Sequence, residues 1–133
     1  METVPEEILQ KLAQLYYQAK KKPSQPGLPL WIKNINDMDV IEVEHETRDT
    51  IRACKDLKRK LGIMEYEGER YVQGRTRREQ VLTDLRREWT LQSYYLYALF
   101  QRSGVMVTEE EFDEVIREET GQKANITNLS ARS

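Results

Sequence analysis

Four basic residues recur at spacings typical of one helix face, and a row of cations is suited to binding phosphate groups. Arg48, Arg52, Lys55 and Arg59, here called the basic row, are separated by four, three and four positions. At about 100° per residue, these spacings place all four within an arc of about 60°. No acidic residue shares the arc, although a solvated helix gains most from alternating charges. The row therefore predicts a surface that contacts a polyanion such as nucleic acid.

The sequence contains no clear signature of catalysis. His45 is the single histidine, beside acidic residues at a predicted helix junction, and no His/Cys cluster suggests a metal site. Cys54 has the spacing of a core residue, and we expect an inert thiol. Glycine-rich phosphate loops and nucleophile motifs are missing. We therefore predict a protein that is not an enzyme, with no cofactor and no metal.

The helix that must position the basic row has clear ends in the sequence. Its predicted apolar face consists of Ile51, Cys54, Leu57 and Leu61. Thr47 is a suitable N-cap and Gly62 a suitable C′ residue, so we predict a helix from Thr47 to Leu61.

The next segment, Ile63 to Gln73, alternates in polarity around a glycine and predicts a β-hairpin. With Glu67-Gly68 as a two-residue turn, cross-strand pairs such as Ile63 with Val72 are sensible. A three-residue loop with Gly68 in the left-handed conformation is equally compatible, because Glu is poor at positive φ.

Before the basic helix, we predict a helix over residues 4–21, with Pro5 in its first turn, and a loop over 22–29. Residues 30–35 fit either a strand or the lead into a helix. Residues 38–44 predict a short helix capped by Asn36 or Asp37, although their β-branched side chains also fit a strand.

After the hairpin, apolar residues repeat at threes and fours over residues 77–102 and predict the longest helix of the chain. Thr108 to Glu111 match a capping box, so an acidic helix should cover about 108–120. Residues 122–133 resemble a flexible tail, which leaves a single domain over 1–121.

The long helix carries more aromatic surface than one short domain is expected to bury. One interpretation is a fully enclosed central helix, and the favoured one is a homodimer or partner interface, where aromatic residues are enriched. The interface residues would be Trp89, Tyr94, Tyr95, Tyr97, Leu99 and Phe100.

Composition sets broad limits on these hypotheses. The chain has 133 residues, of which 33% are charged and 38% apolar, with a formal net charge of -2. Residues 45–87 contain 12 Lys and Arg against 8 Asp and Glu, so a basic middle lies between acidic ends. No signal peptide and no membrane-spanning stretch is visible, and we expect a cytoplasmic protein.

The order of short helix, basic helix and hairpin resembles a winged helix-turn-helix. The best-matching residues are TRDTIRACKDLKRKLGI (47–63) with EGERY (67–71), and the likeness covers roughly 30–73. It implies a mainly α fold with a short β-hairpin wing, flanked by an N-terminal helix and C-terminal helices. In that superfamily the second helix of the motif enters the major groove. The residues placed against DNA would be Arg48, Arg52, Lys55, Arg59, Lys60, Arg70, Arg75, Arg77 and Arg78.

Two acidic segments oppose this hypothesis, because DMDVIEVE (37–44) and the predicted wing would repel phosphate. The basic row also lacks an Asn or Gln that could read adenine. The resemblance predicts a duplex-DNA-binding protein, either a transcriptional regulator or an accessory factor in replication or partition. The alternative is an adaptor or assembly factor that holds a protein partner through helix 89–100 and the acidic C-terminal helix.

Overall fold

The structure, a computed structural model, describes residues 1–67, 75–105 and 108–120, and every regular element in these ranges is helical. The elements are α1 (Glu6–Lys20), α2 (Leu30–Lys33), the 3-10 helix η1 (Asn34–Asp37), α3 (Val40–Glu67), α4 (Arg75–Ser103) and α5 (Glu109–Thr120). The mainly α class is therefore confirmed. A β-hairpin wing does not occur among the described residues.

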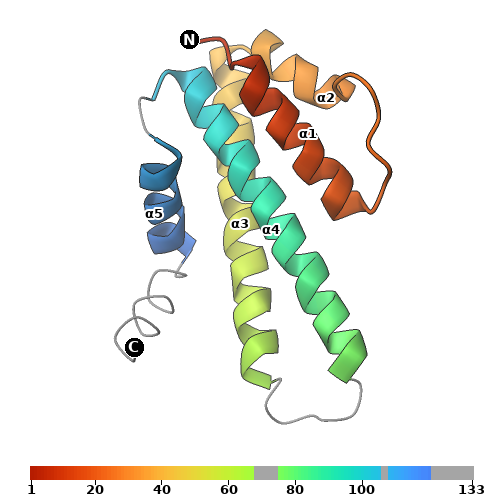
Figure 1. The fold of residues 1–133 in the computed structure, drawn as a ribbon. Coiled ribbons are helices and arrows are strands. Elements are labelled where there is room, and N and C mark those ends of the chain that lie inside the picture. Colours follow the sequence, from red (N-terminus) through yellow and green to blue (C-terminus); the bar gives the residue numbers. More distant parts are fainter. Residues whose placement is uncertain (68–74, 106–107, 121–133) are drawn as a thin grey trace.

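Two long helices form the axis of the molecule (Figure 1). α3 and α4 run antiparallel and pack along each other. α1 packs on the half of α4 nearest its C-terminal end, α2 and η1 lie near the start of α3, and α5 lies beside the long pair. The other halves of α3 and α4 project beyond α1. We call segments 48–62 and 77–87 the arm; the part of the arm nearest α1 contacts the end of that helix, since Lys21 pairs with Asp84.

α3 corrects the prediction of two separate helices over 38–44 and 47–61. It begins after Asp39, whose Oδ1 accepts a hydrogen bond of 2.8 Å from the backbone N–H of Glu42. Thr47 is not an N-cap, since its hydroxyl donates to the carbonyl of Val43 at 2.6 Å inside the helix. No Gly or Pro interrupts residues 40–61, so nothing in the backbone chemistry forces a break there.

The hairpin prediction is wrong over its first half. Residues 63–67 continue α3, and Gly62 lies inside the helix, not at its C′ position. A glycine within a helix costs about 1 kcal/mol relative to Ala, which the packing of α3 on α4 can offset. The proposed second strand lies outside the described residues. The described segments therefore do not form a helix-turn-helix followed by a wing.

Local signals predicted the other long elements well. α1 follows Pro5 and ends at Lys21, whose φ of 56° is left-handed, and α4 ends before Gly104 at φ 83°. Thr108 caps α5, because its Oγ1 accepts from the N–H of Glu111 at 3.1 Å. Residues 30–35 are helical and not a strand.

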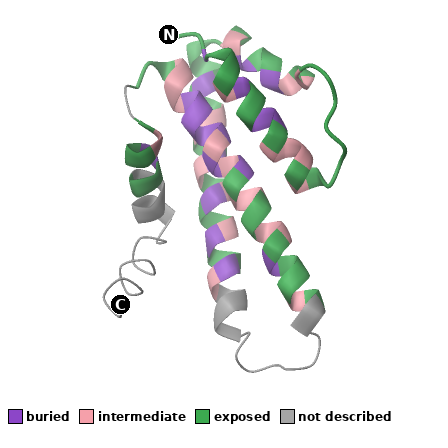
Figure 2. Ribbon diagram, viewed as in Figure 1, coloured by how far each residue is buried: buried purple, intermediate pink, exposed green. Residues whose placement is uncertain are grey.

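The core has two parts that share α4 (Figure 2). One is built from α1, α2, η1 and α4, with Leu12, Ile32 and Leu99 almost completely buried. The other joins α3, α4 and α5 through Cys54, Leu96 and other side chains. α4 is therefore covered on several sides by its own chain.

Candidate functional site

The basic row lies on the solvent-facing side of α3, as the helical spacing predicts. Arg48, Arg52, Lys55 and Arg59 are all exposed, whereas Thr50 and Cys54 between them are buried. Since these residues belong to one uninterrupted helix, the row extends about 16 Å along its axis at about 1.5 Å per residue.

Most of the basic row has no carboxylate partner among the described residues. Arg59 is the exception, because its Nη2 lies 2.8 Å from Oδ1 of Asp56, which also pairs with Lys60 at 3.0 Å. The hydrogen bond from Arg59, followed by that from Lys60, lowers the pKa of Asp56. Other lysines are held in ion pairs, such as Lys21 with Asp84 at 3.0 Å. Within the described part of the chain, Arg48, Arg52 and Lys55 therefore keep their charge available for an external anion.

The remaining predicted DNA contacts are distributed unevenly. Lys60 and Arg77 are exposed on the arm. Arg78 is half-buried, and its Nε and Nη1 are enclosed without a hydrogen-bond partner. Arg70 and the side chain of Arg75 lie outside the described residues. The four residues of the basic row thus lie on one exposed face of α3, whereas the Arg78 side chain is partly enclosed.

The arm as a whole carries positive charge. Its segments 48–62 and 77–87 contain ten Lys and Arg against four Asp and Glu, a formal charge of +6 in a chain of -2. A polyanion would therefore be attracted to the arm and repelled by the rest of the molecule.

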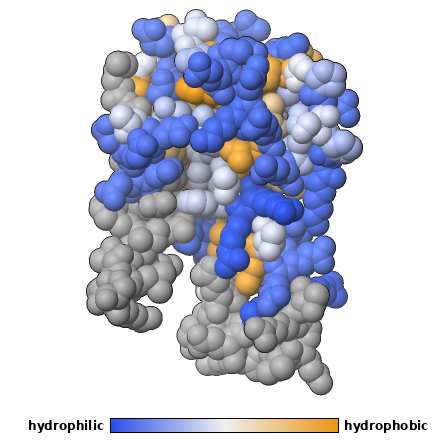
Figure 3. Space-filling model, in the orientation of Figure 1, coloured by the Kyte–Doolittle hydropathy of each residue, from blue (hydrophilic) through white to orange (hydrophobic). Residues whose placement is uncertain are grey.

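The predicted aromatic interface lies largely inside the chain. Tyr95 and Tyr97 are each 8% exposed and Leu99 is fully buried, so one short domain does bury these side chains. Trp89, Tyr94 and Phe100 are half-buried. On the face drawn in Figure 3, strongly apolar residues form only small separate patches. A homodimer stays a prediction, but the reason for placing it on this helix face is removed.

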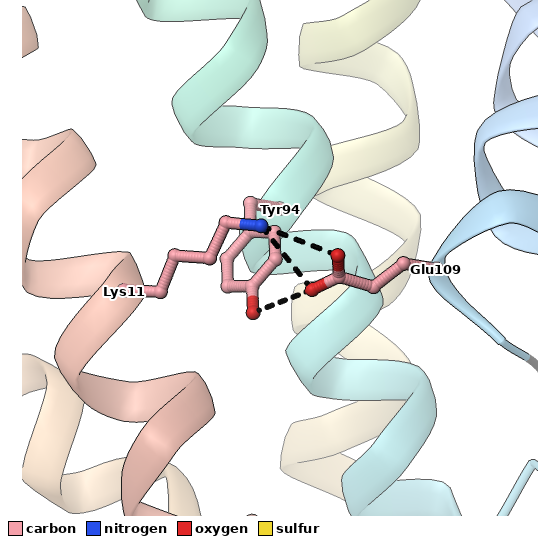
Figure 4. A network of polar contacts seen from close by, with 3 residues as sticks. All are labelled: Lys11, Tyr94 and Glu109. Atoms are coloured by element: carbon pink, nitrogen blue, oxygen red, sulfur yellow. Dashed lines mark hydrogen bonds and ion pairs between the residues drawn. The ribbon is translucent and has the colours of Figure 1, made fainter.

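Tyr94 joins α1, α4 and α5 through a polar network (Figure 4). Its hydroxyl donates to Glu109 Oε1 at 3.0 Å, and Lys11 Nζ lies 3.2 Å from Glu109 Oε2. The same ammonium group lies 4.7 Å from the centre of the Tyr94 ring. Burial, with a smaller effect of the bond to Glu109, raises the pKa of Tyr94. The first turn of the acidic C-terminal helix is thus engaged by its own chain.

A cleft between α1, α2, η1, α3 and α4 was not predicted. It has a volume of about 770 Å³, and we call it the acidic–aromatic cleft. Its carboxylates come from three elements, namely Asp37, Glu42, Glu46, Asp49 and Glu88. Its aromatic lining consists of Tyr16, Trp31 and Tyr95.

The aromatic residues of the cleft are held in a defined arrangement. Trp31 makes edge-to-face contacts with Tyr16 and Tyr95, at ring-centre distances of 5.4 and 5.5 Å. The Tyr95 hydroxyl donates to Glu46 Oε2 at 2.9 Å, and burial together with this bond raises the pKa of Tyr95. Lys20 Nζ, the lysine of the lining, lies 3.6 Å from Glu88.

One signal could have revealed part of this cleft. Glu42, Glu46 and Asp49 follow the i, i+4, i+7 pattern of one helix face. The prediction of separate helices over 38–44 and 47–61 hides this pattern, because it places Glu42 in one helix, Asp49 in the other and Glu46 between them. The aromatic side could not be foreseen, because it joins residues from α1, α2 and α4.

The other reactive side chains fit structural roles. Cys54 is fully buried, 3.9 Å from the Ser93 hydroxyl, and desolvation raises the pKa of its thiol to about 11 despite that contact. His45 is exposed on α3, with Nε2 3.3 Å from Asp49. Among the described residues, no three or more His, Cys, Asp and Glu side chains are grouped so as to hold a metal ion.

None of the helices in the described ranges is both long and apolar enough to cross a bilayer. Comparisons of the chain with protein-family models, with curated proteins and with solved structures gave no match.

Proposed function

We propose that the protein is a non-enzymatic binding protein that contacts the phosphate backbone of duplex DNA through the basic row. The observation that carries the proposal is the exposure of Arg48, Arg52 and Lys55 on one continuous helix, with no carboxylate partner among the described residues. Cations without internal partners can exchange their counterions for phosphate, which favours binding at low salt.

The proposed contact is independent of base sequence. The described residues do not show a wing, and the motif helix expected before the basic helix is part of α3 itself. Charge alone is sufficient for phosphate contacts, whereas base reading requires side chains held in the groove at defined positions. A role as an accessory factor on DNA therefore agrees better with the geometry than a site-specific regulator.

Fluorescence anisotropy with a labelled duplex of random sequence tests the proposal. The double variant Arg52→Glu with Lys55→Glu should bind more than tenfold more weakly than the wild type at low salt. The slope of log affinity against log salt concentration should also be shallower, by the amount expected for the loss of about two phosphate contacts. A matched control is Lys22→Glu with Lys33→Glu, which changes the charge equally at exposed lysines outside the basic row. Absence of wild-type binding at low salt, or an equal loss in the control, would overturn the proposal.

A further inference from the structure

The acidic–aromatic cleft lies on a different side of α3 from the basic row and has the opposite charge. Its lining holds five carboxylates and one lysine, Lys20, which is already paired with Glu88. Phosphate groups would be repelled here, so the cleft cannot serve the DNA contact proposed for the basic row. Charge complementarity selects a cationic occupant.

Three carboxylates run in a line along one wall. Glu42, Glu46 and Asp49 lie on one face of α3, with axial steps of about 6 Å and about 4.5 Å. Glu42 and Asp49 are exposed, and His45 Nε2 lies 3.3 Å from one oxygen of Asp49. Glu46 accepts one hydrogen bond from Tyr95, and both Glu46 and Asp49 retain further acceptor sites. An elongated ligand with repeated positive charges could therefore pair with several carboxylates in sequence.

The aromatic lining supplies the second requirement for recognising an organic cation. Trp31 is half-buried among Tyr16 and Tyr95, and its indole ring contributes to the surface of the cleft. Aromatic faces attract ammonium and guanidinium groups, Trp most strongly, and the attraction increases when the site is partly desolvated. The apolar parts of Met38 and Leu91 also line the cleft and suit the methylene stem of a long basic side chain.

We infer that the acidic–aromatic cleft binds a basic segment of a partner protein, seating a lysine or arginine side chain against Trp31 while neighbouring cations pair with the α3 carboxylates. A volume of about 770 Å³ exceeds that of a single side chain, so several consecutive residues fit. The inference does not depend on DNA binding, which uses the other face of α3.

The test uses the full chain and a fluorescein-labelled peptide of alternating lysine and glycine, measured by anisotropy. Glu42→Gln with Asp49→Asn should weaken binding about tenfold, because two cleft charges are removed. Trp31→Leu, which keeps an apolar side chain without the aromatic face, should weaken binding about fivefold. Trp31→Phe, which keeps an aromatic face, should retain most of the wild-type affinity for the peptide.

The matched control is Glu110→Gln with Glu111→Gln, two exposed carboxylates of α5 away from the cleft, and it should change binding less than twofold. Thermal melts by circular dichroism establish that each variant is folded. Glu42 and Asp49 are exposed, so their double variant remains informative even if Trp31→Leu unfolds.

Three results would overturn the inference. The first is equal binding of the same peptide with acetylated lysines, and the second is an equal loss in the α5 control. The third is displacement of the labelled peptide by spermidine at a lower concentration of positive charge than unlabelled peptide needs for the same displacement. The last result would assign the cleft to a free polyamine. Duplex DNA binding should not change in the Trp31 variants, so failure here is distinguishable from failure of the proposed function.

Discussion

The two polar faces of α3 differ in what packs next to them. The basic row faces solvent, and its exposed residues Arg48, Arg52 and Lys55 form no ion pair among the described residues. The acidic face, which includes Glu46, is bordered by α1, α2, η1 and α4 and becomes one wall of a cleft with aromatic residues opposite. One helix thus provides an open surface suited to an extended polyanion and a concave surface suited to a cation. Neighbouring elements, and not the charges alone, create this difference.

A third face of α3 supports both of these surfaces. Val43, Thr50, Cys54 and Leu61 are buried at spacings of seven, four and seven residues, close to the repeat of two helices packed along their length. If this face holds α3 against α4, then weakening it should damage the basic row and the cleft together. Variants of the two polar faces should instead separate their effects.

The largest expected effect comes from Leu96→Ala in α4. Leu96 is 1% exposed and belongs to the cluster that joins α3, α4 and α5. Its truncation should lower the free energy of unfolding by about 2–5 kcal/mol, measured by urea denaturation. DNA binding and peptide binding should then fail at the same temperature. If one binding activity were lost and the other remained above the melting temperature, the two surfaces would not depend on the same buried face of α3.

A smaller effect is expected from alkaline pH acting on Cys54. Its folded-state pKa of about 11 exceeds the ordinary value of 9.0, so the thiol is neutral below about pH 9 in both folded and unfolded chains. As the pH rises from about 9 to 11, the unfolded state ionises first and stability falls, by on the order of 2 kcal/mol. Urea denaturation at several pH values measures the slope. Cys54→Ala should make the slope shallower, most clearly between pH 9 and 10, because Tyr94 and Tyr95, whose pKa values are also raised by burial, begin to ionise in the unfolded chain only near their ordinary value of 10.0. An unchanged slope between pH 9 and 10 in that variant would assign the effect to other groups.

The smallest expected effect is a gain from Gly62→Ala. Gly62 lies within α3 at negative φ, and an added Cβ would meet nothing within 4 Å. The substitution should stabilise the protein by about 0.5–1 kcal/mol and leave both binding surfaces unchanged, since only the helical backbone is favoured. Thermal denaturation checks this. A loss of stability would instead support the original prediction, in which Gly62 ends the helix with a left-handed conformation.

Local patterns were sufficient for much of the fold. Residues 4–21, 77–102 and 108–120 were predicted as helices from apolar periodicity, Pro5 and the Thr108 cap, and these signals depend only on near neighbours in the chain. The same periodicity placed the basic row on one exposed face. Such features follow from the geometry of a helix and need no knowledge of what packs against it.

Where local signals gave two answers, packing selected between them. Thr47 and Gly62 are good helix ends in isolation, and residues 63–67 alternate like a strand. Along α4, however, a continuous α3 buries Val43, Thr50, Cys54 and Leu61 on one side, and this burial outweighs the small local preferences. Tertiary contacts also enclosed Tyr95 and Tyr97, which the sequence had suggested for a dimer interface.

The sequence by itself thus determined the helical class, the positions of three helices and the sorting of cations onto one face, because each depends on spacing along the chain. Only the tertiary structure decided that α3 is continuous, that the aromatic residues of α4 are internal, and that Tyr16, Trp31 and Tyr95 meet the carboxylates of α3. These last features join residues far apart in the chain. Their proximity is set by how the helices pack, which no local pattern specifies.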